Sequence, residues 1–294
     1  MKMISFSNLN PAVITVWFLS VSAIAMFCNH PVITVLTTAG SVLFYIIRNK
    51  GGHFRSHLFF LLLFLILSLA NPIVSHNGAT VLFVMNDNPV TLESLLYGIN
   101  SSAMIVGVLY LLRSFTQIMT SEKLLYVTGR LSPKLSMILS MAIRFVPLFS
   151  KQGQKVNDTQ KVLGLYKDDN FIDDIKGRLR VFSIVSTWGL ENGIITADSM
   201  EARGYGTGRR TQMTRFGFTF SDASVLAASL ALTALCAAAI AAGKIAFTFY
   251  PKPEAADCGI LGIVGFAAYA LLVFMPLFIE TEVKLRWNYL MSKM

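Results

Sequence analysis

The stretch LFFLLLFLILSLANPIV, residues Leu58–Val74, contains no Asp, Glu, Lys or Arg. Such a run is typical of a helix that crosses a lipid bilayer, because the hydrocarbon core needs about 20 apolar residues and about 17 can suffice. Charged residues are only 14% of the chain, against roughly 25% in a soluble domain. We therefore predict an all-α integral membrane protein. Five more uncharged segments bring the expected number of transmembrane helices to about six: Pro11–Phe27, Val32–Ile47, Leu95–Leu112, Ala223–Gly243 and Gly259–Ile279.

Lys and Arg are distributed unevenly around these six segments. If both termini lie in the cytoplasm, the outer loops 28–31, 75–94 and 244–258 hold two of the 25 basic residues, Lys244 and Lys252. Since basic loops stay on the cytoplasmic side, this orientation is the expected one. This topology then explains the net charge of +9. The expected partner is the lipid bilayer. The net charge does not indicate binding to nucleic acid.

The chain is expected to divide into three parts. An N-terminal bundle of about four spans covers residues 1–115, a cytoplasmic block of long helices covers 116–222, and a C-terminal transmembrane hairpin with a short tail covers 223–294. One further apolar run, Ala79–Met85, is too short to span a bilayer and predicts a re-entrant or interfacial segment.

The central block predicts amphipathic helices. The first covers Pro133–Gln152, where Pro133 suits a first helical turn, Ser132 is a possible cap and Pro147 should introduce a kink. A second helix is expected over Val156–Leu163. These helices need a surface against which to bury their apolar faces: the spans, the inner leaflet or a partner.

A third helix is expected from about Asp173 to Arg203, with an apolar stripe of Leu179, Phe182, Val185 and Trp188. Gly204 is the natural residue for a left-handed C-terminal cap. Arg203 then lies where the helix dipole favours a cation, and its guanidinium can bind a carboxylate through two hydrogen bonds. From local chemistry alone, a plain helix end with a favourable Arg is the better explanation of this stretch.

Two motifs of the block resemble one known family. The stretch Met200-Glu201-Ala202-Arg203-Gly204-Tyr205 resembles the Ala-Arg-Gly signature of the transmembrane (T) component of energy-coupling factor transporters, a family that includes the permease of cobalt transporters. Upstream, Arg144, Phe145 and Pro147 match the family's Arg-Phe-x-Pro segment. The order of spans, coupling helices and further spans also fits, so the resemblance covers most of the chain.

One feature departs from the family pattern. The family typically has a second Ala-Arg-Gly motif roughly forty residues earlier, where this chain reads Lys161-Val162-Leu163-Gly164. Leu163 stands in place of the first Arg, and Lys161 cannot make the same bidentate contact. The resemblance therefore implies one ATPase contact of the usual kind and one degenerate contact.

The resemblance also implies a function. The chain would be a scaffold in a prokaryotic cell membrane that bridges two cytoplasmic ABC-type ATPase subunits and a small substrate-binding membrane (S) subunit. It would couple ATP binding to import of a vitamin or a transition-metal ion. Glu201, Ala202, Arg203 and Gly204 would dock on one ATPase. The chain itself would have no catalytic residue, metal site or cofactor, because its partners bind ATP and cargo.

Two other functions are compatible with parts of the sequence. Asp168 and Asp169 begin an acidic cluster that resembles the Mg²⁺-diphosphate motif of membrane prenyltransferases, although the third acid falls one residue late. His53 and His57 have a spacing that could share a metal on a helix. A stand-alone permease is the other alternative, but no span carries an ionisable residue that could form an ion pathway.

Overall fold

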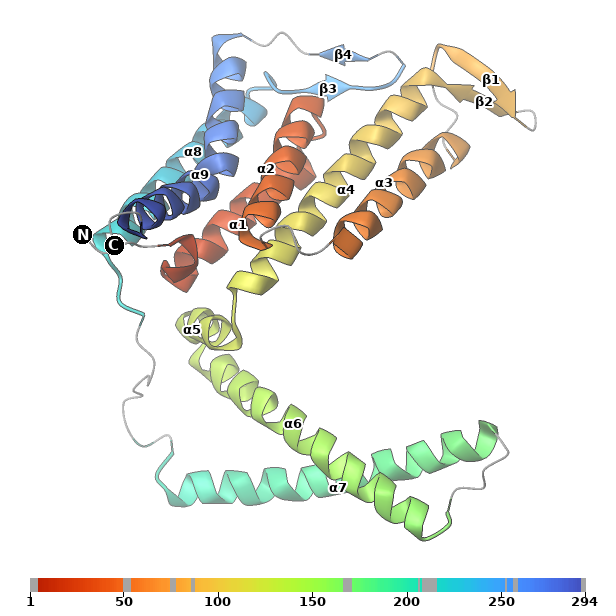
Figure 1. Ribbon diagram of the computed structural model, residues 1–294, viewed down its shortest axis with the longest axis vertical. Coiled ribbons are helices and arrows are strands. Elements are labelled where there is room, and N and C mark those ends of the chain that lie inside the picture. Colours follow the sequence, from red (N-terminus) through yellow and green to blue (C-terminus); the bar gives the residue numbers. More distant parts are fainter. Residues whose placement is uncertain are drawn as a thin grey trace. The chain divides into compact units, whose positions relative to one another are not determined.

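The computed structural model describes residues 5–49, 54–74, 78–85, 88–165, 171–205, 207, 216–251, 253–255 and 259–291. Two compact units are present: one combines Met1–Thr120 with Gly217–Met294, and the other is Ser121–Phe216. The prediction of an all-α protein is confirmed. Along the chain the elements are η1 (Phe6–Asn8), α1 (Pro11–Phe27), α2 (Pro31–Asn49), α3 (Phe54–Val74), β1 (Val81–Met85), β2 (Asn88–Thr91), α4 (Leu92–Ile118), α5 (Ser121–Leu131), α6 (Pro133–Val162), α7 (Phe171–Ala202), α8 (Phe220–Ala241), β3 (Phe247–Thr248), β4 (Glu254–Ala255) and α9 (Ile260–Met291) (Figure 1).

Each of the six predicted spans corresponds to a helix: α1, α2, α3, α4, α8 or α9. By length and hydropathy, six described helices could cross a membrane, but they are not the same six. Helix α1 is apolar yet only 17 residues long, whereas α6, assigned above to the cytoplasmic block, meets both criteria. The mean hydropathy of the best α6 window is 1.2, the lowest of the six, as expected for an amphipathic helix.

The interpretation of Ala79–Met85 as a re-entrant or interfacial segment was incomplete. Val81–Met85 forms β1, which pairs antiparallel with β2. The sequence contains a reason for this pairing, since β-branched and aromatic residues are followed by Asn86-Asp87, residue types that favour turns. A second short antiparallel pair, β3 with β4, lies between α8 and α9.

The N-terminal and C-terminal spans, named separately from the sequence, pack into one unit. Their shared core contains a cluster of aromatic rings in which Trp17 lies edge-on to both Phe6 and Phe18. The Trp17 indole donates a hydrogen bond to the Leu272 carbonyl at 2.9 Å. Such bonds matter because a polar group left unpaired in a membrane interior is costly. A second hydrogen bond of this kind joins the Thr37 hydroxyl to the Tyr269 hydroxyl at 2.7 Å. The bond from Trp17 therefore fixes α1 against α9, and the bond from Thr37 fixes α2 against α9.

Glycines let the spans approach one another closely. A Cβ added to Gly107 of α4 would lie 2.8 Å from the Thr38 methyl and 3.3 Å from the Thr38 backbone nitrogen in α2. Small residues at such positions are typical of membrane helix interfaces, where close packing replaces the hydrophobic effect as the driving force.

Gly107→Ala should therefore destabilise the protein. We expect overpacking against α2 to cost about 1–3 kcal/mol, which exceeds the roughly 0.5–1 kcal/mol that Ala gains over Gly inside a helix. Gly193→Ala in α7 is the matched control, because a Cβ there meets nothing within 4 Å. Thermal unfolding in detergent should show a lower Tm for Gly107→Ala and an unchanged or higher Tm for Gly193→Ala. Equal shifts in both variants would contradict close packing at Gly107.

Candidate functional site

The second unit is built on the helices α6 and α7. The sequence predicted two helices over Pro133–Gln152 and Val156–Leu163, and this was wrong: α6 is one helix of 30 residues with Pro147 inside it. The predicted break fell at Gly153–Lys155, but α6 continues through these residues, where Gly153 lies against Val185 of α7. Ser132 occupies the cap position, but its side chain makes no capping hydrogen bond. The third predicted helix is present as α7, and its first turn carries Asp173 and Asp174.

Helices α6 and α7 pack antiparallel and cross (Figure 1). At the crossing, the Phe149 ring lies over Gly189, where an added Cβ would be 2.7 Å from the ring. The same ring contacts Trp188 edge-on, with 5.9 Å between ring centroids. One turn further along α6, Gly153 faces Val185. The glycines bring the two backbones together, and the aromatic rings fill the remaining space.

Both helices end in the same backbone motif. After α7, Gly204 has a φ of +75°, the Gly204 amide donates to the Glu201 carbonyl at 2.9 Å, and the Tyr205 amide donates to the Met200 carbonyl at 3.0 Å. This pair of bonds defines the Schellman cap, and Gly avoids the strain of its left-handed position. The prediction of a left-handed cap at Gly204 is confirmed.

The end of α6 repeats this geometry. Gly164 has a φ of +67°, its amide donates to the Lys161 carbonyl at 3.0 Å, and the Leu165 amide donates to the Gln160 carbonyl at 3.1 Å. Leu163 and Arg203 therefore occupy the same position of the same cap. The correspondence made by counting residues is also a correspondence of local structure.

The two caps lie at opposite ends of the helix pair (Figure 1). Both are exposed to solvent. Among the described residues Arg203 forms no ion pair, so its guanidinium is available to a partner. At the other cap the exposed side chains are apolar: Val162 is 89% exposed and Leu163 is 66% exposed. The two helix ends therefore share one backbone geometry but expose different side chains, a guanidinium at Arg203 and apolar groups at Val162 and Leu163.

The Arg-Phe-x-Pro segment lies in the middle of α6. Phe145 stacks on Phe149, with 5.7 Å between ring centroids, while Arg144 and Pro147 are exposed. Phe145 also lines a groove of about 440 Å³ between α6 and α7, which reaches the cap through Glu201 and Tyr205. The Tyr205 hydroxyl contacts the sulfur of Met137 on the groove wall. This groove was not predicted, although Met137, Met141 and Phe145 recur at a spacing of four and so share a helix face.

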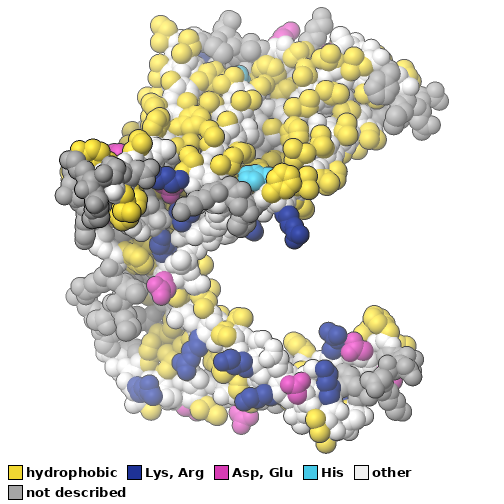
Figure 2. Space-filling model, viewed as in Figure 1, with side chains coloured by type: hydrophobic (Ala, Val, Ile, Leu, Met, Phe, Trp, Pro, Cys, Tyr) yellow, Lys and Arg dark blue, Asp and Glu magenta, His cyan; other side chains and the backbone are white. Residues whose placement is uncertain are grey.

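Much of the apolar surface of the unit has no partner within it. Val185 and Trp188 of the predicted stripe pack toward α6, but Leu179 and Phe182 are 60% and 71% exposed. Figure 2 shows Lys, Arg, Asp and Glu side chains between the yellow hydrophobic ones over this unit. Exposed hydrophobic residues of α7 extend along its length: Phe171, Ile172, Leu179, Phe182, Leu190, Ile194 and Ile195. A surface of this kind is typical of one that a partner or a membrane covers.

Some residues of the acidic cluster and of the histidine pair lie in parts of the chain that the structure does not describe. Asp168 and Asp169 of the acidic cluster and His53 of the histidine pair lie outside the described residues. His57 is described, and its Nδ1 is 3.0 Å from the Tyr110 hydroxyl. This contact gives His57 a structural partner on α4.

Comparison with known families gives a match over most of the chain. The sequence model of the CbiQ family, described as cobalt transport protein, matches residues 4–214. The match includes α1 to α4, both caps and the segment around Phe145, and it ends before α8 and α9. A search of curated proteins found no significant match.

Proposed function

The chain belongs to the CbiQ cobalt transport protein family, and from this we propose that it is the coupling subunit of an ATP-driven importer. In this proposal it bridges two cytoplasmic ABC-type ATPase subunits and a small substrate-binding membrane subunit. It lies in a prokaryotic cell membrane with both termini cytoplasmic. The cargo is a vitamin or a transition-metal ion, of which the family description favours cobalt.

The observation that carries the proposal is the placement of two exposed caps at opposite ends of one antiparallel helix pair, since the cap geometry itself also occurs after α8 at Gly243. An importer with two ATPases needs two docking points, one for each ATPase. Two exposed helix ends with the same backbone geometry, held on one antiparallel pair, provide such points. Neither helix end is covered by the described residues of its own unit.

Arg203 supplies the chemistry of one docking point. A cation at a helix C-terminus is stabilised by the helix dipole, and its planar guanidinium fits a carboxylate through two parallel hydrogen bonds. An acidic groove on an ATPase is therefore its natural partner. At the other point, Leu163 and Val162 would make an apolar contact, so the two ATPase contacts differ in strength and salt dependence.

Transmission of force follows from the contact between the helices. ATP can drive transport only if it favours one arrangement of the assembly over another. When the ATPases close, the two caps shift, and the contact of Phe149 with Gly189 makes α6 and α7 move together. The exposed apolar residues of α7, such as Phe182 and Leu190, would pass this motion to the substrate-binding subunit.

Leu163→Arg should strengthen the weaker ATPase contact. The new guanidinium would occupy the cap position that Arg203 occupies in α7, and a hydrogen bond to a charged group contributes about 1.5–3 kcal/mol. We expect roughly tenfold tighter ATPase association in a pull-down titration. Val162→Arg is the control, because it adds the same charge one residue outside the cap position. Unchanged association of Leu163→Arg would show that the first site does not use this position.

Reconstitution tests the function as a whole. The chain would be placed in proteoliposomes with the ATPase and membrane subunits expressed from its neighbouring genes, and uptake of radioactive Co²⁺ would be followed with and without ATP. We expect uptake only when all subunits and ATP are present. ATP-independent uptake by the chain alone would instead support the stand-alone permease.

A further inference from the structure

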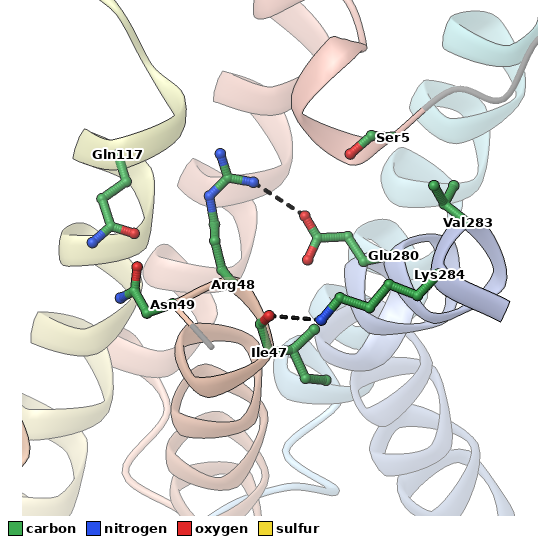
Figure 3. Close-up of a pocket in the computed structure, with 8 residues that line it drawn as sticks. All are labelled: Ser5, Ile47, Arg48, Asn49, Gln117, Glu280, Val283 and Lys284. Carbon is green, nitrogen blue, oxygen red and sulfur yellow. Dashed lines mark hydrogen bonds and ion pairs between the residues drawn. The ribbon is translucent and has the colours of Figure 1, made fainter. Parts of the chain in front are cut away.

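A cavity of about 520 Å³ lies at one end of the first unit, where α2 ends and α4 and α9 pass (Figure 3). Its walls come from four separate parts of the chain, and most of its polar side chains can donate hydrogen bonds. The polar lining residues are Ser5, Arg48, Asn49, Gln117, Glu280 and Lys284. Apolar parts of the wall are contributed by Ile47 and Val283.

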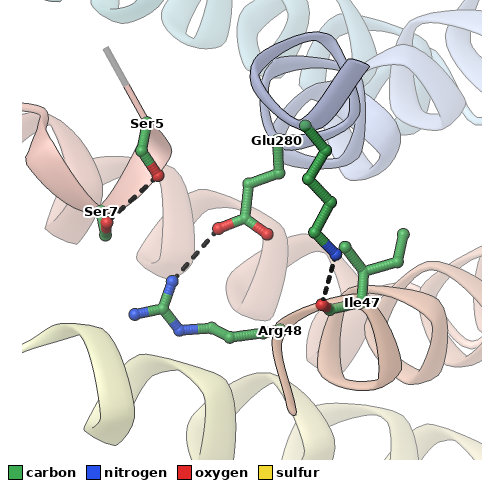
Figure 4. Close-up of polar contacts among 6 residues, drawn as sticks. Ser5, Ser7, Ile47, Arg48 and Glu280 are labelled. Carbon is green, nitrogen blue, oxygen red and sulfur yellow. Dashed lines mark hydrogen bonds and ion pairs between the residues drawn. The ribbon is translucent and has the colours of Figure 1, made fainter. Parts of the chain in front are cut away.

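Two cations and one carboxylate set the charge of this cavity. Arg48 Nη1 lies 3.1 Å from Glu280 Oε1, an ion pair that joins α2 to α9 (Figure 4). Figure 3 shows the other terminal nitrogen of Arg48 pointing away from Glu280. Lys284 donates one hydrogen bond to the Ile47 carbonyl at 2.8 Å, and an ammonium group has two further donors. The cavity therefore keeps a net positive charge and spare donors after its internal contacts are made.

Asn49 adds an unsatisfied donor. Its Nδ2 is buried and has no hydrogen-bond partner among the described residues. A buried donor without an acceptor costs about 1–3 kcal/mol, so its acceptor is expected outside the described residues, in the chain or in a ligand. An anion with several acceptor oxygens would suit the donors that Arg48 and Lys284 keep after these contacts.

The place of the cavity in the fold indicates the source of that anion. It lies where α2 ends, beside helices that are long and apolar enough to cross a membrane. On the proposed orientation this end faces the cytoplasm. Near it the spans present lipid-facing apolar side chains, since Ile46 of α2 is 40% exposed and Phe278 of α9 is 64% exposed. Phospholipid phosphates lie at this depth, directly above the acyl chains.

We propose that this cavity binds the phosphate group of an anionic phospholipid in the inner leaflet. Lys284 and the free side of the Arg48 guanidinium bind the phosphate oxygens. Glu280 holds Arg48 in place and remains paired with it. The lipid thereby joins the end of α2 to α9, next to the sequence that leads into α3. This binding is independent of the ATPase contacts proposed above.

Native mass spectrometry of the purified full chain tests this proposal. The chain would be released from micelles that contain equal amounts of phosphatidylglycerol and phosphatidylcholine, and the retained lipids would be counted. We expect wild type to retain phosphatidylglycerol preferentially. Lys284→Gln should lower that retention about fivefold, the factor expected for one basic residue at an anionic surface. The pair Arg48→Gln with Glu280→Gln, which leaves no unpaired buried charge, removes one donor without changing the net charge and should lower it less than Lys284→Gln does.

Arg286→Gln is the matched control. Arg286 lies on the same helix and pairs with Glu282 rather than lining the cavity. Wild-type retention by Lys284→Gln, or an equal loss in Arg286→Gln, would overturn the proposal in favour of diffuse attraction. A last measurement adds excess inorganic phosphate to the chain. If the phosphate binds the chain in phosphatidylcholine alone and phosphatidylglycerol adds nothing, phosphate recognition stands and the lipid as its source is overturned.

Discussion

Arg203→Ala should abolish ATP-dependent uptake while leaving the fold intact. The side chain is exposed and forms no ion pair with the described residues, so its removal costs the isolated chain little. In the assembly it would remove a charge-assisted bidentate contact, and we expect ATPase association to weaken about 10- to 100-fold. Uptake by the reconstituted complex, measured beside the Tm of the chain, checks both parts of this expectation.

Two further variants separate the shape of Arg203 from its charge. Arg203→Lys keeps the charge but loses the planar fork, so its uptake should fall between wild type and Arg203→Ala. Arg180→Ala removes an exposed cation from the same helix, away from the cap, and should leave uptake unchanged. Equal losses in Arg180→Ala and Arg203→Ala would mean that the net charge of α7 matters rather than the cap.

Gly189→Leu should separate ATP hydrolysis from transport. The new side chain would clash with the Phe149 ring, which already lies 2.7 Å from where a Cβ would be. Overpacking of this kind typically costs about 1–3 kcal/mol, and here it would force α6 and α7 apart. Because both caps remain present, we expect the ATPases still to associate and hydrolyse ATP. Uptake for each ATP hydrolysed should fall sharply.

A second change tests whether the crossing itself is responsible. Phe149→Ala opens the space that the larger side chain of Gly189→Leu would need, so combining the two changes should restore part of the lost uptake. A double-mutant cycle on uptake per ATP hydrolysed would then give a clear interaction between the two sites. If the two changes were simply additive, transmission would not pass through the contact of Phe149 with Gly189.

The sequence predicted elements best where one strong signal dominated. Uncharged segments such as Leu58–Val74 placed six helices, because the cost of a charge in a bilayer leaves few alternatives. Gly204 after a helix predicted a left-handed cap because few other residues tolerate that conformation. These inferences depend on local chemistry, which a single sequence contains.

Features that depend on packing were missed or misjudged. Helix α6 was divided in two between Gln152 and Val156, because the support that α7 gives to α6 is invisible in a local pattern. Val81–Met85 was not recognised as a strand, because its pairing partner is a separate segment. The sequence could not show which residues of the predicted stripe face α6: Trp188 contacts Phe149 and Phe182 is exposed, because the direction of each side chain on α7 depends on where α6 crosses it. The roles of Arg144, Lys161 and the two caps in docking remain predictions.

Co-purification tests the central claim most directly. The tagged chain would be expressed with its neighbouring genes, extracted in detergent and analysed for bound ATPase subunits, with wild type and Arg203→Ala compared side by side. The account predicts two ATPase subunits for each wild-type chain and a clear loss of ATPase from Arg203→Ala. Absence of ATPase from both samples, or equal amounts in both, would contradict a coupling role for the cap at Arg203.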